Sequence, residues 1–409
     1  MRMNKKKIVP KLRFPEFIGD KLKITKLGKI SSVVKEKAGE NKYTLMSVTS
    51  GVGLIPQTEK FGREIAGDSY KNYIVIRKYD FAYNKSATKQ FPEGYISMLE
   101  EYDIAAVPNS IFTCFRITGN ESYPPFFDYL WHNNYHGHWL RKYIEVGARA
   151  HGALSVDTKH LWSMPLALPD FKEQQKIADC LSSIDELIDA ENRKLKALEK
   201  YKKGLMQKLF PAEGKALPEW RFPEFRGKSE WRIKPLGKIC TNYDSRRIPI
   251  TEKDRVKGEI PYIGASGVID YINDFIFDED LLCVSEDGAN LVARTYPIAF
   301  SISEKTWVNN HAHVLKFSHK YTQDIVESYL NMINLQDFLT GMAQPKLNRA
   351  KLDIIPIPLP EEEEQQKIAG CLSDVDTMIT EQSNKVEQLK AHKKGLMQGL
   401  FPSLEEADV

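Results

Sequence analysis

One helical segment occurs twice in this chain, at residues 173–211 and 364–402, and each copy follows a stretch that does not resemble the other. The copies read EQQKIADCLSSIDELIDAENRKLKALEKYKKGLMQKLFP and EQQKIAGCLSDVDTMITEQSNKVEQLKAHKKGLMQGLFP. Their identities all fall at one offset of 191 residues. An internal repeat constrains the architecture before any finer feature is considered. The chain is therefore expected to consist of two halves that carry different domains on the same support.

Length and composition agree with a protein of more than one domain. The 409 residues exceed what a single hydrophobic core usually organises, and the 42% hydrophobic and 28% charged contents are ordinary for globular proteins. No apolar run is long enough to span a bilayer, and the basic start MRMNKKKIVPK lacks the apolar region of a secretory signal. This basic arm is either a solvated tail or a phosphate-contacting arm. The five cysteines show no CxxC spacing, which predicts free thiols in a reducing cytoplasm.

Both helical copies carry a sustained heptad seam. Its members alternate spacings of four and three, the signature of a coiled coil rather than of a lone amphipathic helix. Because one seam needs another to bury it, the two copies are expected to pair. The seam consists of Ile177, Leu181, Ile184, Ile188, Glu191, Leu195, Leu198, Lys202, Leu205 and Leu209 in the first copy, and of Ile368, Leu372, Val375, Ile379, Gln382, Val386, Leu389, Lys393, Leu396 and Leu400 in the second.

Glu191 and Gln382 are polar members of the seams, each at the midpoint of its helix. If the midpoints meet, a buried hydrogen bond between them would set the register at some cost in stability. Alternatively, both side chains reach solvent at the edge of the seam. The match itself does not distinguish parallel from antiparallel pairing. Because a whole domain separates the two helices in the chain, the connection favours the antiparallel arrangement.

Glycine and proline mark the ends of both helices. Gly204 and Gly395 lie in the last turns, where glycine costs about 1 kcal/mol relative to alanine. Their repetition predicts a bend or a close backbone approach, with fraying as the simpler alternative. Pro211 and Pro402 then end each helix, because proline cannot continue the hydrogen-bond ladder.

A second repeat precedes each variable block. RFPEF at 13–17 recurs at 221–225, an offset of 208, and residues 161–166 correspond to 352–357 at the offset of 191. The first variable block is therefore 17 residues longer than the second. The expected order is an N-terminal arm with the first RFPEF motif (1–18), a first domain (19–168), a long helix (169–211), a linker with the second motif (212–227), a second domain (228–359), a second long helix (360–402) and a C-terminal tail (403–409).

Both variable blocks are expected to mix helices and strands. Runs of β-branched and aromatic residues at 73–76 and 111–115 are bounded by turn residues, which is typical of short strands. The aromatic-rich stretches 126–143 and 321–338 are expected to be helical. The predicted fold class is α+β, with two mixed domains joined by two long helices that form an antiparallel coiled coil in a pseudo-twofold tandem repeat.

Polar and basic loops of the variable blocks supply the candidate binding residues. Asn, His, Lys and Arg side chains suit contacts with base edges and phosphates, although each loop taken singly is as well explained by solvation. His311 and His313 alternate along a predicted strand, so they are expected to share a face. Two histidines without a third ligand at recognisable spacing predict no metal site. The candidates are Lys85, Lys89, Arg149, His151, Asn290, Arg294, Asn309, Asn310, His311, His313, Lys346 and Arg349.

Signatures of catalysis are missing from the sequence. There is no GxxxxGK[ST] or GxGxxG nucleotide loop, no HExxH and no GxSxG. No catalytic residues are therefore predicted.

The combined motifs resemble the specificity (S) subunits of type I restriction-modification systems. The resemblance covers essentially the whole chain. It is carried by the EQQKIA helix starts, the KKGLMQ helix ends, the RFPEF motifs, and the runs YIGASGVIDYINDFIF, EDGANLVARTYPIAFSI and WVNNHAHVL. It implies that each variable block is a target-recognition domain that reads one half of a bipartite, asymmetric site in double-stranded DNA. The paired helices would set the spacing of the half-sites.

The resemblance also implies partners. Two modification (methyltransferase) subunits would dock on the helices, and two restriction (motor and nuclease) subunits would join them. S-adenosylmethionine, ATP and Mg would belong to these partners, with no cofactor bound by this chain and no membrane involved. The competing hypotheses are a recognition subunit of another restriction class, which would differ in its partners, and a scaffold that carries two ligand-binding domains without DNA.

Overall fold

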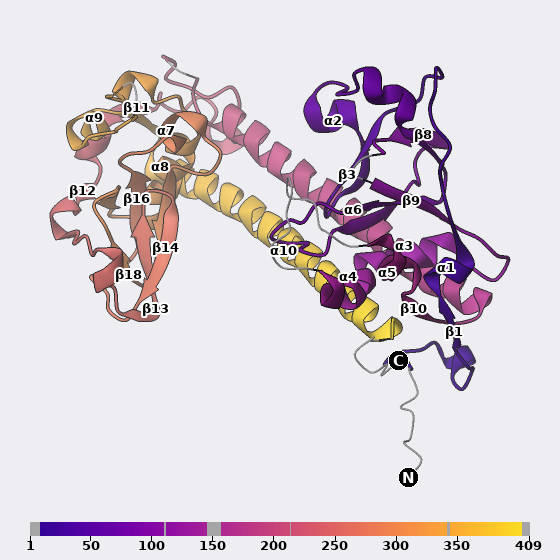
Figure 1. Ribbon diagram of the computed structural model, residues 1–409. Coiled ribbons are helices and arrows are strands. Elements are labelled where there is room, and N and C mark those ends of the chain that lie inside the picture. The colour runs from indigo at the N-terminus through magenta and orange to yellow at the C-terminus, as the bar shows by residue number, and fades with distance from the viewer. Residues whose placement is uncertain (1–8, 110–111, 145–156, 213, 342–343, 403–409) are drawn as a thin grey trace, which may run out of the picture. The chain divides into compact units, whose positions relative to one another are not determined.

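The computed structural model describes residues 9–109, 112–144, 157–212, 214–341 and 344–402. Its contacts divide the chain into two compact units: unit 1 holds residues 1–191 and 385–409, and unit 2 holds residues 192–384. The long helices α6 (Phe171–Leu209) and α10 (Glu362–Leu400) each contribute one part to either unit (Figure 1). Each unit thus combines one variable block with parts of both helices. The boundaries between the units fall within the long helices rather than between consecutive domains of the sequence.

The helix pair in unit 1 is antiparallel. Asp185 on α6 pairs with Lys393 on α10 at 2.5 Å, and Glu191 further along α6 pairs with Lys385 at 2.5 Å. Residue numbers therefore fall along α10 as they rise along α6. Asp170 accepts a hydrogen bond from the backbone N–H of Glu173, which caps the start of α6.

Unit 2 has the same antiparallel order. Lys202 pairs with Asp376, while Leu209 at the end of α6 shares a core with Ile368 near the start of α10. In both copies, every predicted seam residue is buried or half-buried, which confirms the coiled-coil seam. Gln382 is 5% exposed, so it does not reach solvent. Its predicted hydrogen bond with the other seam's polar residue stays a prediction.

Unit 1 is built on a four-stranded antiparallel sheet in the order β2-β9-β6-β7. Helix α3 packs beside β7, and the aromatic side chains Phe81, Phe115 and Trp131 fill the core between sheet and helices. The strands are β1 (Lys23–Lys26), β2 (Ser31–Val33), β3 (Met46–Thr49), β4 (Gly53–Pro56), β5 (Ile74–Arg77), β6 (Asp80–Asn84), β7 (Tyr95–Met98), β8 (Ile104–Val107), β9 (Phe112–Ile117) and β10 (Pro165–Leu168). The helices are η1 (Pro15–Phe17), α1 (Leu27–Ile30), α2 (Gln57–Phe61), η2 (Asp68–Asn72), α3 (Pro124–His132), α4 (Tyr135–Leu140), η3 (Arg141–Tyr143) and α5 (Thr158–Trp162).

Unit 2 contains the corresponding sheet, in the order β12-β19-β16-β17, and a second sheet in the order β14-β13-β18-β15. Helix α8 packs on β17, as α3 does on β7. The strands are β11 (Arg232–Pro235), β12 (Thr241–Asn242), β13 (Lys257–Gly264), β14 (Gly267–Ile272), β15 (Phe277–Asp278), β16 (Leu281–Ser285), β17 (Ala299–Ile302), β18 (Lys305–Val308), β19 (Ala312–Lys316) and β20 (Pro356–Leu359). The helices are η4 (Pro223–Phe225), η5 (Leu236–Lys238), η6 (Asp244–Arg246), η7 (Glu252–Asp254), α7 (Asn290–Ala293), α8 (Lys320–Met332), η8 (Gln336–Phe338) and α9 (Arg349–Asp353).

The RFPEF motifs clamp the starts of the long helices in the same way in both units. In unit 1, the guanidinium of Arg13 donates two hydrogen bonds to the buried carboxylate of Glu173. In unit 2, Arg221 does the same with Glu364. The strand pairs β1–β10 and β11–β20 close each variable block beside this contact. The co-repetition of RFPEF and EQQ in the sequence thus reflects one structural device, used twice.

Glycine has a packing role beside these motifs but not in the long helices. A Cβ on Gly28 would lie 3.0 Å from the carbonyl oxygen of Trp162, and one on Gly237 would lie 2.9 Å from Cβ of Asp353. A Cβ on Gly204 or Gly395 would have no described atom within 4 Å beyond its own helical turns. Both residues lie inside continuous helices. The predicted close backbone approach at these two helix glycines is therefore wrong for the described part of this chain.

Candidate functional site

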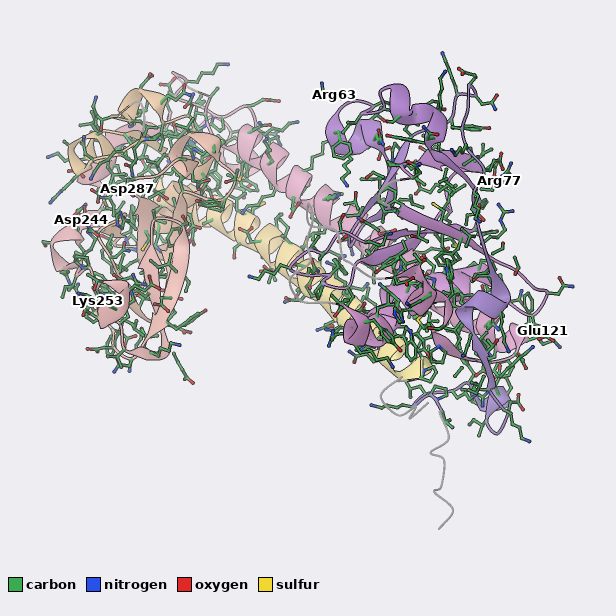
Figure 2. The ribbon with its side chains drawn as sticks, in the orientation of Figure 1. Arg63, Arg77, Glu121, Asp244, Lys253 and Asp287 are labelled. Atoms are coloured by element: carbon green, nitrogen blue, oxygen red, sulfur yellow. The ribbon has the colours of Figure 1, made fainter. Side chains whose placement is uncertain are left out.

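A polar cluster lies where strand β16 ends in unit 2. His313, on β19, is 1% exposed; its Nδ1 lies 2.6 Å from Oδ2 of Asp244, and its Nε2 lies 2.7 Å from the carbonyl oxygen of Leu347. Glu286 directly follows β16, and its Oε2 lies 3.8 Å from Nδ1 of His313. Asp244 and the neighbouring Asp287 are labelled in Figure 2. The cluster therefore joins η6, β16, β19 and the segment before α9.

Two cations balance the carboxylates of this cluster. Arg247 donates to Oε2 of Glu286 at 2.7 Å, and Nζ of Lys346 lies 3.2 Å from Oε1 of the same residue. Burial would raise the pKa of Glu286, but the hydrogen bond from Arg247 and the charges of His313 and Lys346 outweigh it, so the pKa is lowered overall. The pKa of Asp244 is lowered in the same way, against the effect of burial, by its hydrogen bonds and charged neighbours.

The ligand atoms of Asp244, Glu286 and His313 lie within 4.8 Å of one another, a spacing that a metal ion could bridge. However, both oxygens of Glu286 already face Arg247 and Lys346. A divalent cation would therefore meet two positive charges, and the cluster is better described as an ion-pair network.

His311 and His313 do not share a face, contrary to the expectation from their spacing. Strand β19 begins at Ala312, so His311 precedes it; the side chain of His311 is 52% exposed and lies 2.9 Å from Asp287. His313 is enclosed by protein. The alternation rule fails because it requires both residues to belong to the strand.

Three other candidates in unit 2 have polar groups engaged within the fold. Asn290 is buried, and its amide bonds to Tyr296 and Thr295. Arg294 donates to the carbonyl oxygens of residues 291, 330 and 333, and burial lowers the pKa of its guanidinium. Asn309 is buried and accepts a hydrogen bond from the backbone N–H of residue 311. These contacts give all three residues a structural role, and DNA contact by them stays a prediction.

The remaining candidates lie on accessible loops or outside the described residues. Asn310 and Arg349 are exposed, and Arg349 lies 3.6 Å from Asp353. In unit 1, Lys85 is half-buried just after β6 and Lys89 is exposed. Arg149 and His151 fall outside the described residues.

The two units place unlike side chains at equivalent backbone positions. Thr241 lies opposite Lys316 as Ser32 lies opposite Arg116, which aligns the β12–β19 and β2–β9 pairs. The same alignment places Thr113 on β9 where His313 lies on β19. The pairing of these strands with β6 and β16 then matches Lys85 with Glu286, and the residues after β2 and β12 match Lys35 with Asp244. One framework thus carries two lysines in unit 1 where unit 2 carries two carboxylates.

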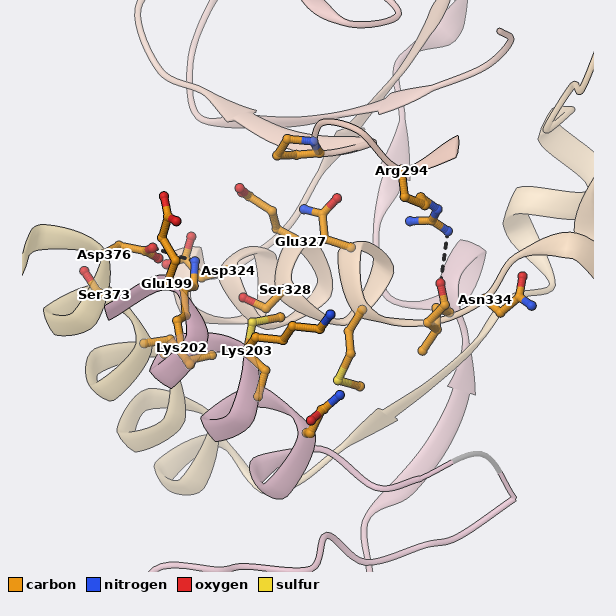
Figure 3. A pocket seen from close by; sticks show the side chains of 18 of the residues that line it. Glu199, Lys202, Lys203, Arg294, Asp324, Glu327, Ser328, Asn334, Ser373 and Asp376 are labelled. Carbon is orange, nitrogen blue, oxygen red and sulfur yellow. Dashed lines mark hydrogen bonds and ion pairs between the residues drawn. The ribbon is translucent and has the colours of Figure 1, made fainter. Parts of the chain in front are cut away.

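Each unit also contains a cleft beside its helix pair. The cleft in unit 2 has a volume of about 760 Å³ and lies between α8 and the two long helices (Figure 3). The cleft in unit 1 has a volume of about 950 Å³. Five positions of the first helix copy line one cleft, and the same five repeat positions of the second copy line the other. These are Glu199, Lys202, Lys203, Met206 and Gln207 in unit 2, and Lys390, Lys393, Lys394, Met397 and Gln398 in unit 1.

The KKGLMQ motif supplies most of these shared positions. Its first lysine is taken up by an ion pair across the helix pair: Lys202 with Asp376 in unit 2, and Lys393 with Asp185 in unit 1. The second lysine, Lys203 or Lys394, is exposed in the cleft, as is the glutamine one turn later. The motif therefore combines one lysine that is paired across the helices with one that is exposed.

Several of these features carried no clear sequence signal. Asp244, Arg247 and Glu286 were not among the candidates, because nothing in the local pattern marks residues that meet from distant segments. The two clefts had a signal that could have found them, namely the repetition of KKGLMQ in both copies, in which Lys203, Met206 and Gln207 lie outside the heptad seam.

A family model for the type I restriction modification DNA specificity domain matches this chain twice, at residues 28–200 and 228–391. The chain belongs to this family. A Haemophilus influenzae protein whose name assigns it to the type I restriction enzyme specificity subunits is 33% identical over 153 residues, 37% of this chain and 39% of that protein. A Methanocaldococcus jannaschii protein with such a name, MjaX, is 28% identical over 264 residues, 62% of each chain. The matches thus span about two fifths and three fifths of these relatives' lengths.

Solved structures of the type I specificity family share the fold. The S subunit of a type I restriction-modification system from M. genitalium aligns with a TM-score of 0.59 and 15% identity, covering 97% of this chain and 99% of that chain. A chain from a study of complex assembly and conformational transition in the type I system aligns with a TM-score of 0.58 and 15% identity, over 94% and 98% of the chains. At this identity, the likeness shows the fold, which agrees with the predicted α+β tandem repeat. In the described part of the chain, every helix is too short or too polar for a membrane span.

Proposed function

We propose that this chain recognises a specific sequence in double-stranded DNA, with each unit reading one half of a bipartite, asymmetric site. The observation that carries this proposal is the register match between the two sheets, which present different side chains from one framework. Lys85 and Lys35 stand in unit 1 where Glu286 and Asp244 stand in unit 2. Unlike side chains on like frameworks are what recognition of two different half-sites requires. The double match to the family supports the same assignment.

The chemistry of recognition follows from the accessible polar groups. Exposed lysines bind phosphates without regard to sequence, while imidazole and amide groups read base edges in the major groove. Lys89 in unit 1 and Lys346 in unit 2 suit phosphates, and His311 and Asn310 suit base edges. Since Asp287 accepts from His311, it orients the ring and leaves its other nitrogen free to contact a base.

The helix pair would hold the half-sites at a set spacing and dock partners. The two equivalent clefts support docking of two copies of one partner, because each presents the same lysine, methionine and glutamine from the KKGLMQ motif. We assign these partners as the two modification (methyltransferase) subunits, which two restriction subunits would join. S-adenosylmethionine, ATP and Mg would be bound by these partners, and the chain itself would perform no chemistry.

Mapping of methylated bases tests this function directly. DNA treated with the complex of this chain and its methyltransferase subunits should be modified at one sequence with two separated specific parts. Affinity of the purified complex for a duplex with that sequence should fall steeply with salt, by roughly 0.9 in log K per log unit of salt for each phosphate contacted. Binding that is indifferent to salt, together with random or absent methylation, would favour a ligand-binding scaffold instead.

A further inference from the structure

His313 is held between two hydrogen-bond acceptors. Its Nε2 lies 2.7 Å from the carbonyl oxygen of Leu347, and a carbonyl oxygen can only accept, so this nitrogen carries a proton. Its Nδ1 lies 2.6 Å from Asp244, which also accepts a hydrogen bond from the backbone N–H of Val314. The guanidinium of Arg247 lies 3.5 Å from the same oxygen, which favours the ionised carboxylate, so Asp244 accepts here too. Both ring nitrogens are therefore donors, and the ring is an imidazolium.

The charges that face this ring come from three further segments. Asp244 lies on η6, Glu286 follows β16, and each carries a negative charge toward His313. Arg247 and Lys346 pair with Glu286, and Arg247 also lies 3.5 Å from Asp244. The exposed side chains nearby, Asp287 and His311, pair with each other rather than with His313.

The hydrogen bond to Leu347 ties down the segment that carries Lys346. Two backbone hydrogen bonds hold the same segment to the end of β16: the N–H of Gly288 donates to Pro345, and the N–H of Leu347 donates to Glu286. The same end of β16 is linked to the loop of His311, whose carbonyl oxygen accepts from the N–H of Glu286. His313 is therefore bonded directly to the segment of Lys346 and, through this segment and Glu286, linked to the loop of His311. These are the two loops that unit 2 would present to DNA.

We propose that His313 is a positioning residue, whose doubly protonated ring clasps the Pro345–Leu347 segment to β19 and η6 and so sets the placement of Lys346 and His311 against DNA. The effect of this clasp on DNA binding rests on the proposed DNA recognition. The two hydrogen bonds of His313 do not depend on it. Thr113 occupies the equivalent place in unit 1, and its hydroxyl has a single donor. Only the half-site read by unit 2 should therefore depend on such a clasp.

The protonation state is tested by NMR on the full chain with ¹⁵N-labelled histidine at neutral pH. Both ring nitrogens of His313 should carry protons, and the backbone N–H of Leu347 should be protected from exchange. A His313 ring with one unprotonated nitrogen overturns the proposal. This measurement needs no DNA, so it remains decisive even if the proposed function fails.

Two substitutions separate the halves of the clasp. His313→Gln can reach Leu347 but no longer donates to Asp244, and His313→Asn keeps the donor toward Asp244 but not the reach to Leu347. In the complex with methyltransferase subunits, His313→Asn should weaken binding to a duplex with the mapped site about tenfold, the cost of one charged hydrogen bond. His313→Gln should bind better than His313→Asn, because it keeps the bond to Leu347.

The final control is to determine in which half-site the substitution changes the discrimination of bases. Substitutions of bases in the half-site of unit 2 should be discriminated less well by His313→Asn, while discrimination in the other half stays as in the wild type. Uniform loss over both halves indicates general destabilisation and overturns the positioning role. Wild-type affinity of both variants overturns it as well.

Discussion

Arg221 and Glu364, 143 positions apart in the chain, form a doubly hydrogen-bonded ion pair in which Nε and Nη2 each lie 2.7 Å from a carboxylate oxygen. The Glu364 side chain is 2% exposed. Arg13 and Glu173 form the same pair in unit 1. The pair fastens each RFPEF motif to a helix start, so that a variable block begins and ends at one place. Blocks with different sequences can thereby be held on the same support.

Removing one partner of this pair should be costly. Glu364→Ala leaves the guanidinium of Arg221 largely buried without its countercharge, and we expect a loss of about 3 kcal/mol in the free energy of unfolding. Denaturant unfolding of the full chain measures it. The matched control is Glu363→Ala: the side chain of Glu363 is 80% exposed, and its pairing with Lys228 is worth less than about 1 kcal/mol. Equal effects of the two substitutions would contradict the assigned role.

Alanine at two glycines should have effects of opposite sign. Gly237→Ala would bring its Cβ to 2.9 Å from Cβ of Asp353, and the required shift should destabilise unit 2 by about 1–3 kcal/mol. Gly395→Ala meets nothing within 4 Å among the described residues and should stabilise the isolated chain by about 1 kcal/mol through higher helix propensity. Thermal unfolding distinguishes the two. A destabilising Gly395→Ala would indicate a close approach that the described residues do not show.

Charge reversal in the clefts should remove partners one at a time. Lys203→Glu changes only the cleft of unit 2, so a complex with one methyltransferase subunit is expected in place of two. The double variant Lys203→Glu with Lys394→Glu should retain none. Light scattering coupled to size-exclusion chromatography gives the stoichiometry.

Lys200→Glu provides the control for this series, because Lys200 is exposed on the same helix and does not line the cleft. It should assemble with two subunits. If the double variant also assembles fully, docking at the clefts is wrong, while DNA recognition by the units is unaffected.

Unit 2 should lose stability in acid through its polar cluster. The pKa values of Asp244 and Glu286 are lowered in the fold, despite burial, by their cationic partners. These carboxylates therefore stabilise the fold above the ordinary carboxyl pKa of about 4, and the contribution is lost as the pH falls through the lowered values. Unfolding free energy should decline with acid more steeply in the wild type than in Asp244→Asn. Parallel pH profiles would show that Asp244 contributes no such linkage.

The sequence predicts best those parts of the structure that depend on the spacing of residues along one helix. The seams from Ile177 and from Ile368 were correct at every position, since burial in a coiled coil depends on spacing along one helix. Asn290 and His313 show the limit. The side chain of a polar residue can bond to near neighbours in the chain, as in Asn290, or to a residue 69 positions away, as in the pairing of His313 with Asp244. Such side-chain contacts leave no periodic pattern in the sequence, so they could not be predicted from it.

Exchange of one variable block tests the central claim most directly. Residues 19–164 would be replaced by the corresponding block of another member of the type I specificity family, with Arg13, Glu173 and both long helices retained. Methylated bases are then mapped in DNA treated with the assembled complex. One half of the recognised sequence should change while the other half and the spacing stay the same. A change in both halves, or in neither, would contradict the assignment of one reader to each unit.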